Sequence, residues 1–92
     1  MRITYDPIKR QKALLERGLD FERAVEVFSG VTLEWEDSRF EYSERRILCI
    51  GHLYGRMVMI AYTPRGSARR IISMGKCNVS EIKKYAPYFD EA

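Results

Sequence analysis

The sequence has few of the residues on which most catalytic and metal-binding sites depend. It contains one histidine, His52, and two cysteines, Cys49 and Cys77, so a mechanism that needs two histidines and a zinc site of the usual four-ligand kind are both excluded. A glycine-rich phosphate loop and a Ser-His-Asp set are also absent. The longest apolar stretch, residues 57–62, is too short to span a membrane. With no secretory signal at the N-terminus, we expect a cytoplasmic protein without a disulfide bond and without a membrane partner.

What the sequence does have is an ordinary globular composition with an uneven distribution of charge. Its 92 residues are 46% hydrophobic and 32% charged, which suits one domain, residues 1–92, and leaves no room for a second core. Residues 31–44 carry five acidic side chains against Arg39 alone, whereas residues 45–80 carry seven basic side chains and no acidic one. Such a block of cations is balanced by solvent or by an anionic partner. Nucleic acid is the commonest anion large enough to use it.

The hydrophobic pattern of residues 1–30 predicts one short strand and two helices. The strand covers residues 2–5. The first helix is capped by Asp6 and ends at Gly18, because a short acidic side chain can accept from free N–H groups and glycine tolerates the left-handed backbone of a helix end. The second helix covers residues 21–28.

After Gly30 the pattern predicts a sheet built of antiparallel hairpins. The spacing of apolar residues changes from about 3.6 to 2, and compact turn sequences separate the later strands. We expect strands over residues 31–36, 46–54, 57–63 and 68–74. A last helix begins after Asn78 and ends at Tyr85, before Pro87. The predicted fold is a small α+β domain, an antiparallel meander sheet with two N-terminal helices packed on it and a C-terminal helix.

The residue types that are present suit one chemistry, the cleavage of RNA without a metal ion. There the 2′-hydroxyl of the substrate is the nucleophile, and the protein orients it, supplies a base and an acid, and stabilises the charge on phosphorus. Cations that persist at neutral pH suit the last role. We expect Arg70 and Lys76 to stabilise this charge and Glu44 or His52 to transfer protons. The expected phosphate-binding residues are Arg45, Arg46 and Arg69.

Each of these residues also has a simpler interpretation. Basic side chains at strand ends are most often only hydrated, and Arg69 and Arg70 must point to opposite faces of their strand, so at most one of them lines a given site. Tyr54, Tyr62 and Tyr85 offer rings on which bases stack, although aromatic side chains in strands more often pack in a core. A plain RNA-binding domain is therefore an alternative.

Four short segments occur in an order that characterises one protein family. Residues 5–9 read Tyr-Asp-Pro-Ile-Lys, and residues 17–24 read Arg-Gly-Leu-Asp-Phe-Glu-Arg-Ala. Residues 43–51 read Ser-Glu-Arg-Arg-Ile-Leu-Cys-Ile-Gly, and residues 70–76 read Arg-Ile-Ile-Ser-Met-Gly-Lys. Together they resemble the aromatic-Asp-Pro-x-Lys, His-Gly-Val-Ser-Phe-Glu-Glu-Ala, Glu-x-Arg…Ile-Gly and Arg-Ile-Ile-Ser-Ala-Arg-Lys motifs of the BrnT toxins of bacterial type II toxin–antitoxin modules. The resemblance covers almost the whole chain.

This resemblance implies a fold, an activity and partners. It implies a RelE-like fold, a ribonuclease that inhibits translation, and no cofactor. The implied partner is a BrnA-like antitoxin with a ribbon-helix-helix domain, and the complex would reach operator DNA only through that antitoxin. Arg17 stands where the family pattern has histidine, and we expect it to bind RNA phosphate.

One departure from the family pattern concerns catalysis. Gly75 stands where the pattern has arginine, and a missing guanidinium of this kind removes roughly 2 to 4 kcal/mol of transition-state stabilisation. The glycine fits either an altered, disarmed toxin or a diverged member of the family. It also favours an alternative function, a catalytically silent module that binds an antitoxin and tunes repression of the promoter.

Overall fold

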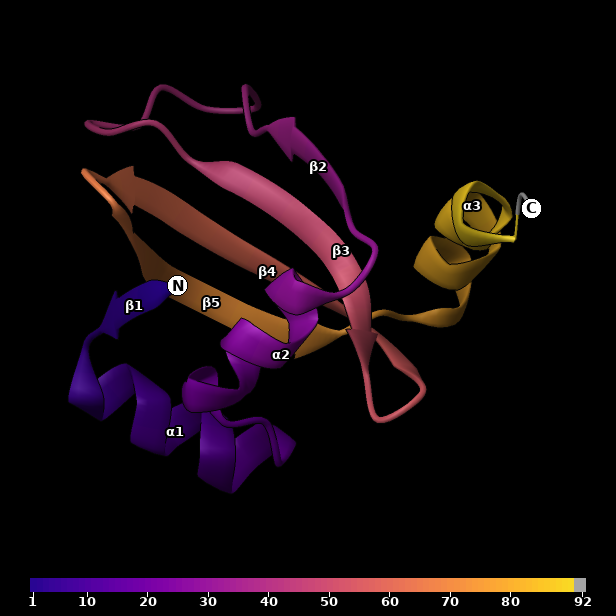
Figure 1. Cartoon of the computed structure of the whole chain (residues 1–92), viewed down its shortest axis with the longest axis horizontal. Helices are drawn as coiled ribbons and strands as arrows, with labels where there is room; N and C mark the ends of the chain where they lie inside the picture. Colours follow the sequence, from indigo (N-terminus) through magenta and orange to yellow (C-terminus); the bar gives the residue numbers. More distant parts are fainter. Residues whose placement is uncertain (91–92) are drawn as a thin grey trace.

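The computed structural model describes residues 1–90 and consists of a five-stranded sheet with helices on both of its faces (Figure 1). In chain order the elements are β1 (Arg2–Tyr5), α1 (Pro7–Arg17), a 3₁₀ turn η1 (Phe21–Arg23), α2 (Ala24–Ser29), β2 (Leu33–Glu36), β3 (Ile47–Leu53), β4 (Arg56–Arg65), β5 (Ala68–Lys76) and α3 (Val79–Phe89). The predicted small α+β domain is confirmed, with differences in the sheet and in two helices. None of the helices in residues 1–90 is long and apolar enough to cross a membrane.

The sheet is mixed rather than purely antiparallel. Its strand order is β1-β5-β4-β3-β2, and strands β2 to β5 form the predicted meander. The first strand, β1, pairs in parallel with the start of β5, with Ile3 opposite Arg69 and Tyr5 opposite Ile71. No hairpin joins β1 to its neighbour, so no turn sequence specifies the direction of this pairing. Because β1 ends at Tyr5, the second half of β5 has an open edge.

A register shift divides β5 into two halves. Ser73 lies opposite Ala61, but Ile71 lies opposite Tyr62, so Ile72 is the extra residue of a bulge. A bulge of this kind reverses the alternation of side chains beyond it. Ile71 and Met74, three positions apart, therefore both belong to the core beneath the helices.

The first helix begins and ends where its capping residues predict. In α1 the Asp6 side chain accepts from the Ile8 N–H at 2.9 Å, and Gly18 ends the helix with φ of +67°. The segment predicted as one second helix is instead the turn η1 followed by α2. The tighter first turn brings Phe21, Ala24 and Val27 into one core, each no more than 2% exposed.

This core lies between α1, α2 and one face of the sheet, on the side where Figure 1 shows the two helices together. At Gly51 of β3, α2 lies so near the strand that a Cβ atom would be 2.7 Å from Cγ1 of Val27. Glycine at this position allows α2 to pack directly on the strand.

The other face of the sheet is only partly covered, by α3. Tyr85 of α3 stacks on Trp35 of β2, with ring centroids 5.3 Å apart, and Phe89 meets the His52 ring edge-on at 4.8 Å. The prediction that this helix ends before Pro87 is wrong, because α3 continues to Phe89. Proline removes one N–H from the last turn, but the apolar contacts beyond it keep the chain helical.

Candidate functional site

A cleft of about 690 Å³ opens on the part of the sheet that α3 leaves uncovered. Its floor consists of side chains of β3, β4 and β5, namely Leu48, Met59, Ala61 and Ser73. Its rim consists of charged side chains from five parts of the chain. Glu16 and Arg17 end α1, Asp37 and Arg39 follow β2, Arg46 precedes β3, Lys76 ends β5 and Glu81 lies in the first turn of α3. Elements far apart in the sequence therefore supply one concave, charged surface.

Arg17 enters the cleft over the open edge of β5. As the last residue of α1 it reaches the strand where β1 no longer pairs, and its Nη1 donates to the carbonyl oxygen of Met74 at 3.0 Å. The same nitrogen lies 4.0 Å from the place that a Cβ atom of Gly75 would take. A guanidinium group is thus fixed beside position 75, although residue 75 itself has no side chain.

Arg46 reaches the cleft from the start of β3 and retains hydrogen-bonding capacity. Its guanidinium lies over the ring of Tyr42, 4.0 Å from the ring centroid. Its Nε is buried and makes no hydrogen bond within the described part of the chain. A buried donor without an acceptor is costly, so holding this guanidinium over Tyr42 beside the cleft reduces the stability of the fold.

The segment between β2 and β3 is held by a buried carboxylate, Asp37, which is 5% exposed. Its oxygens accept from Nε and Nη2 of Arg39, both at 2.9 Å, and from the hydroxyl of Tyr42 at 2.8 Å. The Arg39 guanidinium is the main reason that the pKa of Asp37 lies far below its usual value. This anchor fixes Tyr42 beneath Arg46. The sequence did not reveal this anchor, because Asp37 falls between the predicted strands over residues 31–36 and 46–54, where no periodic pattern predicts its contacts.

The balance of charge in the cleft is positive. Asp37 is neutralised by Arg39, and Glu81 accepts from the backbone N–H of Asn78 at 2.8 Å as part of the α3 cap. None of the six ion pairs found in residues 1–90 includes Arg17, Arg46 or Lys76. The side chain of Glu16 is exposed and takes part in none of these six ion pairs.

Three of the eight predicted site residues meet in this cleft: Arg17, Arg46 and Lys76. Arg70 lies on the earlier half of β5, opposite Thr4 and Thr63. Arg69 lies on the α2 side, over the rings of Phe28 at 4.4 Å and Tyr62 at 5.0 Å. Arg69 and Arg70, for which we predicted phosphate binding and charge stabilisation, therefore do not line the cleft.

The remaining predicted residues are occupied elsewhere. Glu44 forms an ion pair with Arg65 at 2.7 Å, and Arg45 forms one with Glu36 at 2.8 Å. His52 packs on α3, as described above. The structure does not bring these side chains together with Arg17, Arg46 and Lys76.

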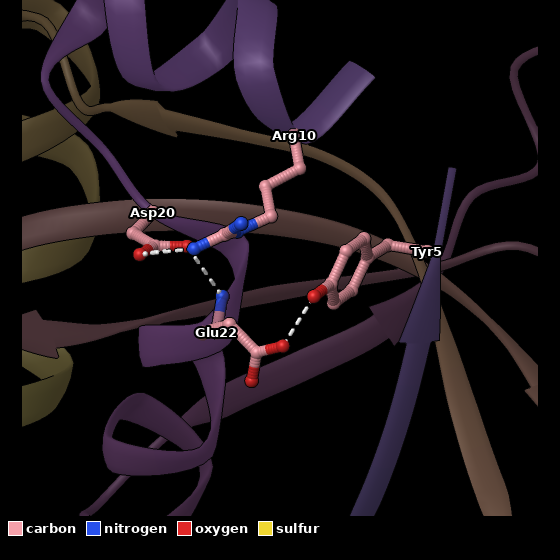
Figure 2. A network of polar contacts seen from close by, with 4 residues as sticks. All are labelled: Tyr5, Arg10, Asp20 and Glu22. Carbon is pink, nitrogen blue, oxygen red and sulfur yellow. Dashed lines mark hydrogen bonds and ion pairs between the residues drawn. The ribbon is translucent and has the colours of Figure 1, made fainter. Parts of the chain in front are cut away.

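A second polar cluster joins β1, α1 and η1 and fixes the helix that carries Arg17 (Figure 2). Arg10 donates from Nε and Nη2 to the two carboxylate oxygens of Asp20, at 2.8 and 3.0 Å, and the Tyr5 hydroxyl donates to the carboxylate of Glu22. The Arg10 bond lowers the pKa of Asp20, and the Glu22 bond raises the pKa of Tyr5. Tyr5, Asp20 and Glu22 lie in the first two sequence motifs, and Arg10 directly follows the first. These contacts give the two motifs a structural role.

The described residues contain no group of three or more His, Cys, Asp or Glu side chains placed to hold a metal ion. Residues 5–81 match the family model described as ribonuclease toxin, BrnT, of type II toxin–antitoxin system. The matched range includes the polar cluster of Figure 2 and every residue that lines the cleft. A search of curated proteins found no match.

Proposed function

The chain belongs to the BrnT family of ribonuclease toxins of type II toxin–antitoxin systems, and from this premise we propose that it cleaves RNA in the cleft lined by Arg17, Arg46 and Lys76. One observation carries the proposal. Three cations from separate elements converge on a single concave surface and have no carboxylate partner within residues 1–90. Such a site suits a phosphate group whose negative charge increases in the transition state.

In the proposed reaction the RNA supplies its own nucleophile, so no metal ion is required. The ribose 2′-hydroxyl attacks phosphorus, the bond to the 5′ oxygen breaks, and a cyclic phosphate and a 5′-hydroxyl form. Arg17 and Arg46 hold the phosphate oxygens, and the ammonium of Lys76 hydrogen-bonds the departing 5′ oxygen, which takes a proton from water. Glu16, the cleft carboxylate with no ion-pair partner in the described residues, accepts the proton of the 2′-hydroxyl and then passes it to the hydroxide that forms when water protonates the 5′ oxygen. This assignment replaces Glu44 and His52, whose side chains make contacts elsewhere.

The position of Arg17 supports activity despite the glycine at position 75. Its Nη1 lies 4.0 Å from where a Gly75 side chain would begin, so the cleft keeps a guanidinium close to the position that holds arginine in the family pattern. We propose that Arg17 takes over the charge-stabilising role there.

Membership of a type II family implies an antitoxin partner. We propose that this partner is a BrnA-like antitoxin with a ribbon-helix-helix domain. In the complex, only this antitoxin domain contacts operator DNA. We further propose a RelE-like fold, action in the cytoplasm, and inhibition of translation as the consequence of RNA cleavage.

The test compares adjacent arginines in a cleavage assay on total RNA in EDTA. Arg46→Gln removes the guanidinium that lines the cleft, whereas Arg45→Gln removes its neighbour, which is paired with Glu36 at the surface. We expect wild type and Arg45→Gln to cleave at similar rates and Arg46→Gln to be slower by about 10²- to 10³-fold. Loss of cleavage in EDTA, or equal effects of the two substitutions, would refute the proposal.

A silent antitoxin-binding module is the second candidate, and Gly75 is the observation that favours it. It predicts that wild type leaves RNA intact and still forms a tight antitoxin complex. Cleavage by Gly75→Arg alone would identify this chain as a disarmed toxin. Cleavage by wild type would exclude the silent module.

A further inference from the structure

A second hollow, of about 440 Å³, adjoins the cleft at the end of β5. Lys76 lines both, and Arg17 of the cleft is followed directly by Gly18 of the hollow. The hollow lies between the segment after α1 and the β3–β4 hairpin. Its lining includes Asp20, Arg23, Leu53, Tyr54, Arg56 and Lys76. The two concave surfaces therefore meet at Lys76, and a path between them crosses the edge of the sheet from the α3 face to the face that carries the N-terminal helices.

Positive charge continues along this path. The one carboxylate of the hollow, Asp20, is already bound by Arg10 at 2.8 Å. Arg56 and Lys76 take part in none of the ion pairs within the described part of the chain, and Arg23 is paired only with Glu26 on its own helical segment, at 3.3 Å. An anion that occupies the cleft would meet further unpaired cations if it were a polymer of phosphates.

Tyr54, at the mouth of the hollow, occupies a backbone position that disfavours tyrosine. It has φ of +51° and Gly55 has φ of +77°, so both central residues of this tight hairpin turn are left-handed. Glycine, asparagine and aspartate are the residues that suit such a turn. A bulky non-glycine residue held there is strained, and strain of this kind concentrates at functional sites.

The fold gains little from the ring that causes this strain. The side chain of Tyr54 is 77% exposed. Its hydroxyl makes one long hydrogen bond, to Glu26 at 3.4 Å. The ring is therefore available to a ligand, directly beside Arg56.

We propose that the β3–β4 hairpin is a nucleobase subsite for single-stranded RNA: a strand that leaves the cleft passes Lys76 and Arg56 and stacks a base on Tyr54. The proposal rests on the ribonuclease function proposed above and extends it to the flanking nucleotides of the substrate. Because every base presents a π face, stacking on Tyr54 tolerates any base. The hairpin thus adds affinity for an unpaired nucleotide without reading sequence.

The test uses a substitution that relieves the strain while it removes the ring. Tyr54→Asn suits the left-handed backbone, so we expect an unchanged or higher melting temperature together with RNA binding weakened by about five- to one-hundred-fold. Tyr54→Phe keeps the ring and should bind as wild type does. The probe is a short fluorescein-labelled 2′-O-methyl RNA, which cannot be cleaved through a 2′-hydroxyl, and the readout is fluorescence anisotropy in EDTA.

Two arginines at the ends of β4 provide a matched pair for the phosphate contact. Arg56→Gln should weaken binding and reduce the slope of log affinity against log salt by about 0.7, the value for one phosphate of a single strand, over about 50 to 200 mM salt. Arg65→Gln removes a cation already paired with Glu44 and should leave the slope unchanged.

The outcomes separate this proposal from the one on which it rests. If Arg46→Gln weakens RNA binding but Tyr54→Asn and Arg56→Gln bind as wild type does, the hairpin subsite is refuted and the cleft remains. If wild type does not bind the RNA at all, both the hairpin subsite and the proposed RNA-binding cleft are refuted. A lower melting temperature for Tyr54→Asn would show that the ring serves the fold and would also overturn the subsite.

Discussion

The close contact between α2 and β3 allows a quantitative prediction for Gly51→Ala. Relaxed contacts between carbon atoms are about 3.5 to 4.0 Å, whereas the new methyl group would lie 2.7 Å from Cγ1 of Val27 and 3.2 Å from Cγ2 of Thr32. Val27 is 1% exposed and has little space into which to move. Overpacking of this kind destabilises the fold by about 1 to 3 kcal/mol. Alanine also lowers the conformational entropy of the unfolded chain, which stabilises the fold by about 0.4 to 1 kcal/mol. We expect a net loss of about 1 to 2 kcal/mol in the free energy of unfolding.

A double-mutant cycle isolates the clash. Val27→Ala alone removes buried methyl groups and should cost roughly 2 kcal/mol, but it also removes the atom that Gly51→Ala would meet. The double variant should therefore be more stable than the sum of the single effects by about 1 to 2 kcal/mol. Urea denaturation followed by the fluorescence of Trp35, the one tryptophan of the chain, measures all four free energies.

The control is a glycine beside the same valine. A Cβ atom at Gly30 would lie at an ordinary 3.7 Å from the carbonyl oxygen of Val27, so Gly30→Ala should be neutral or slightly stabilising. Additive effects in the cycle, or equal tolerance of alanine at positions 30 and 51, would refute the reasoning from packing.

Two further predictions concern titrating groups. The Arg39 guanidinium lowers the pKa of Asp37 in the folded state, so the Asp37 anchor stabilises the fold above about pH 4, the unfolded value, and loses this contribution as pH falls. Wild type should therefore melt at a higher temperature than Asp37→Asn at neutral pH, and this difference should become smaller below about pH 4. A difference that stays constant with pH would contradict the stabilising role of the Asp37 carboxylate. Burial raises the pKa of the Cys49 thiol to about 12 and that of Cys77 to about 11. Both should stay unreactive toward a disulfide reagent at neutral pH until denaturant is added, whereas rapid reaction of the native protein would show that a thiol is accessible.

Local signals in the sequence were sufficient for elements whose partners are nearby in the chain. The turn at Tyr54 and Gly55 joins two strands that pair with each other, and Asp6 and Gly18 bound α1 as their chemistry requires. The parallel pairing of β1 was not predictable in this way, because β5 follows it only after α1, α2 and three intervening strands. The extension of α3 past Pro87 likewise depends on contacts of Phe89 with another element.

The same distinction applies to the candidate site. Composition showed that residues 45–80 carry cations without acids, and the residues that line the cleft include two of these cations. It did not show which of the cations are already neutralised. Arg45 and Arg46 are neighbours of the same type, yet Arg45 pairs with Glu36 at the surface and Arg46 retains an unpaired Nε.

The sequence by itself determined the class of the fold, the caps and turns, the excess of positive charge and the family, because each depends on residue type or on short spacing. The tertiary structure alone decided that Arg17, Arg46 and Lys76 share one cleft. It also placed a guanidinium beside Gly75 and left Tyr54 strained and exposed. The shared cleft and the guanidinium beside Gly75 depend on where β1 stops along β5 and on how closely α1 approaches the open edge, and no local pattern encodes either.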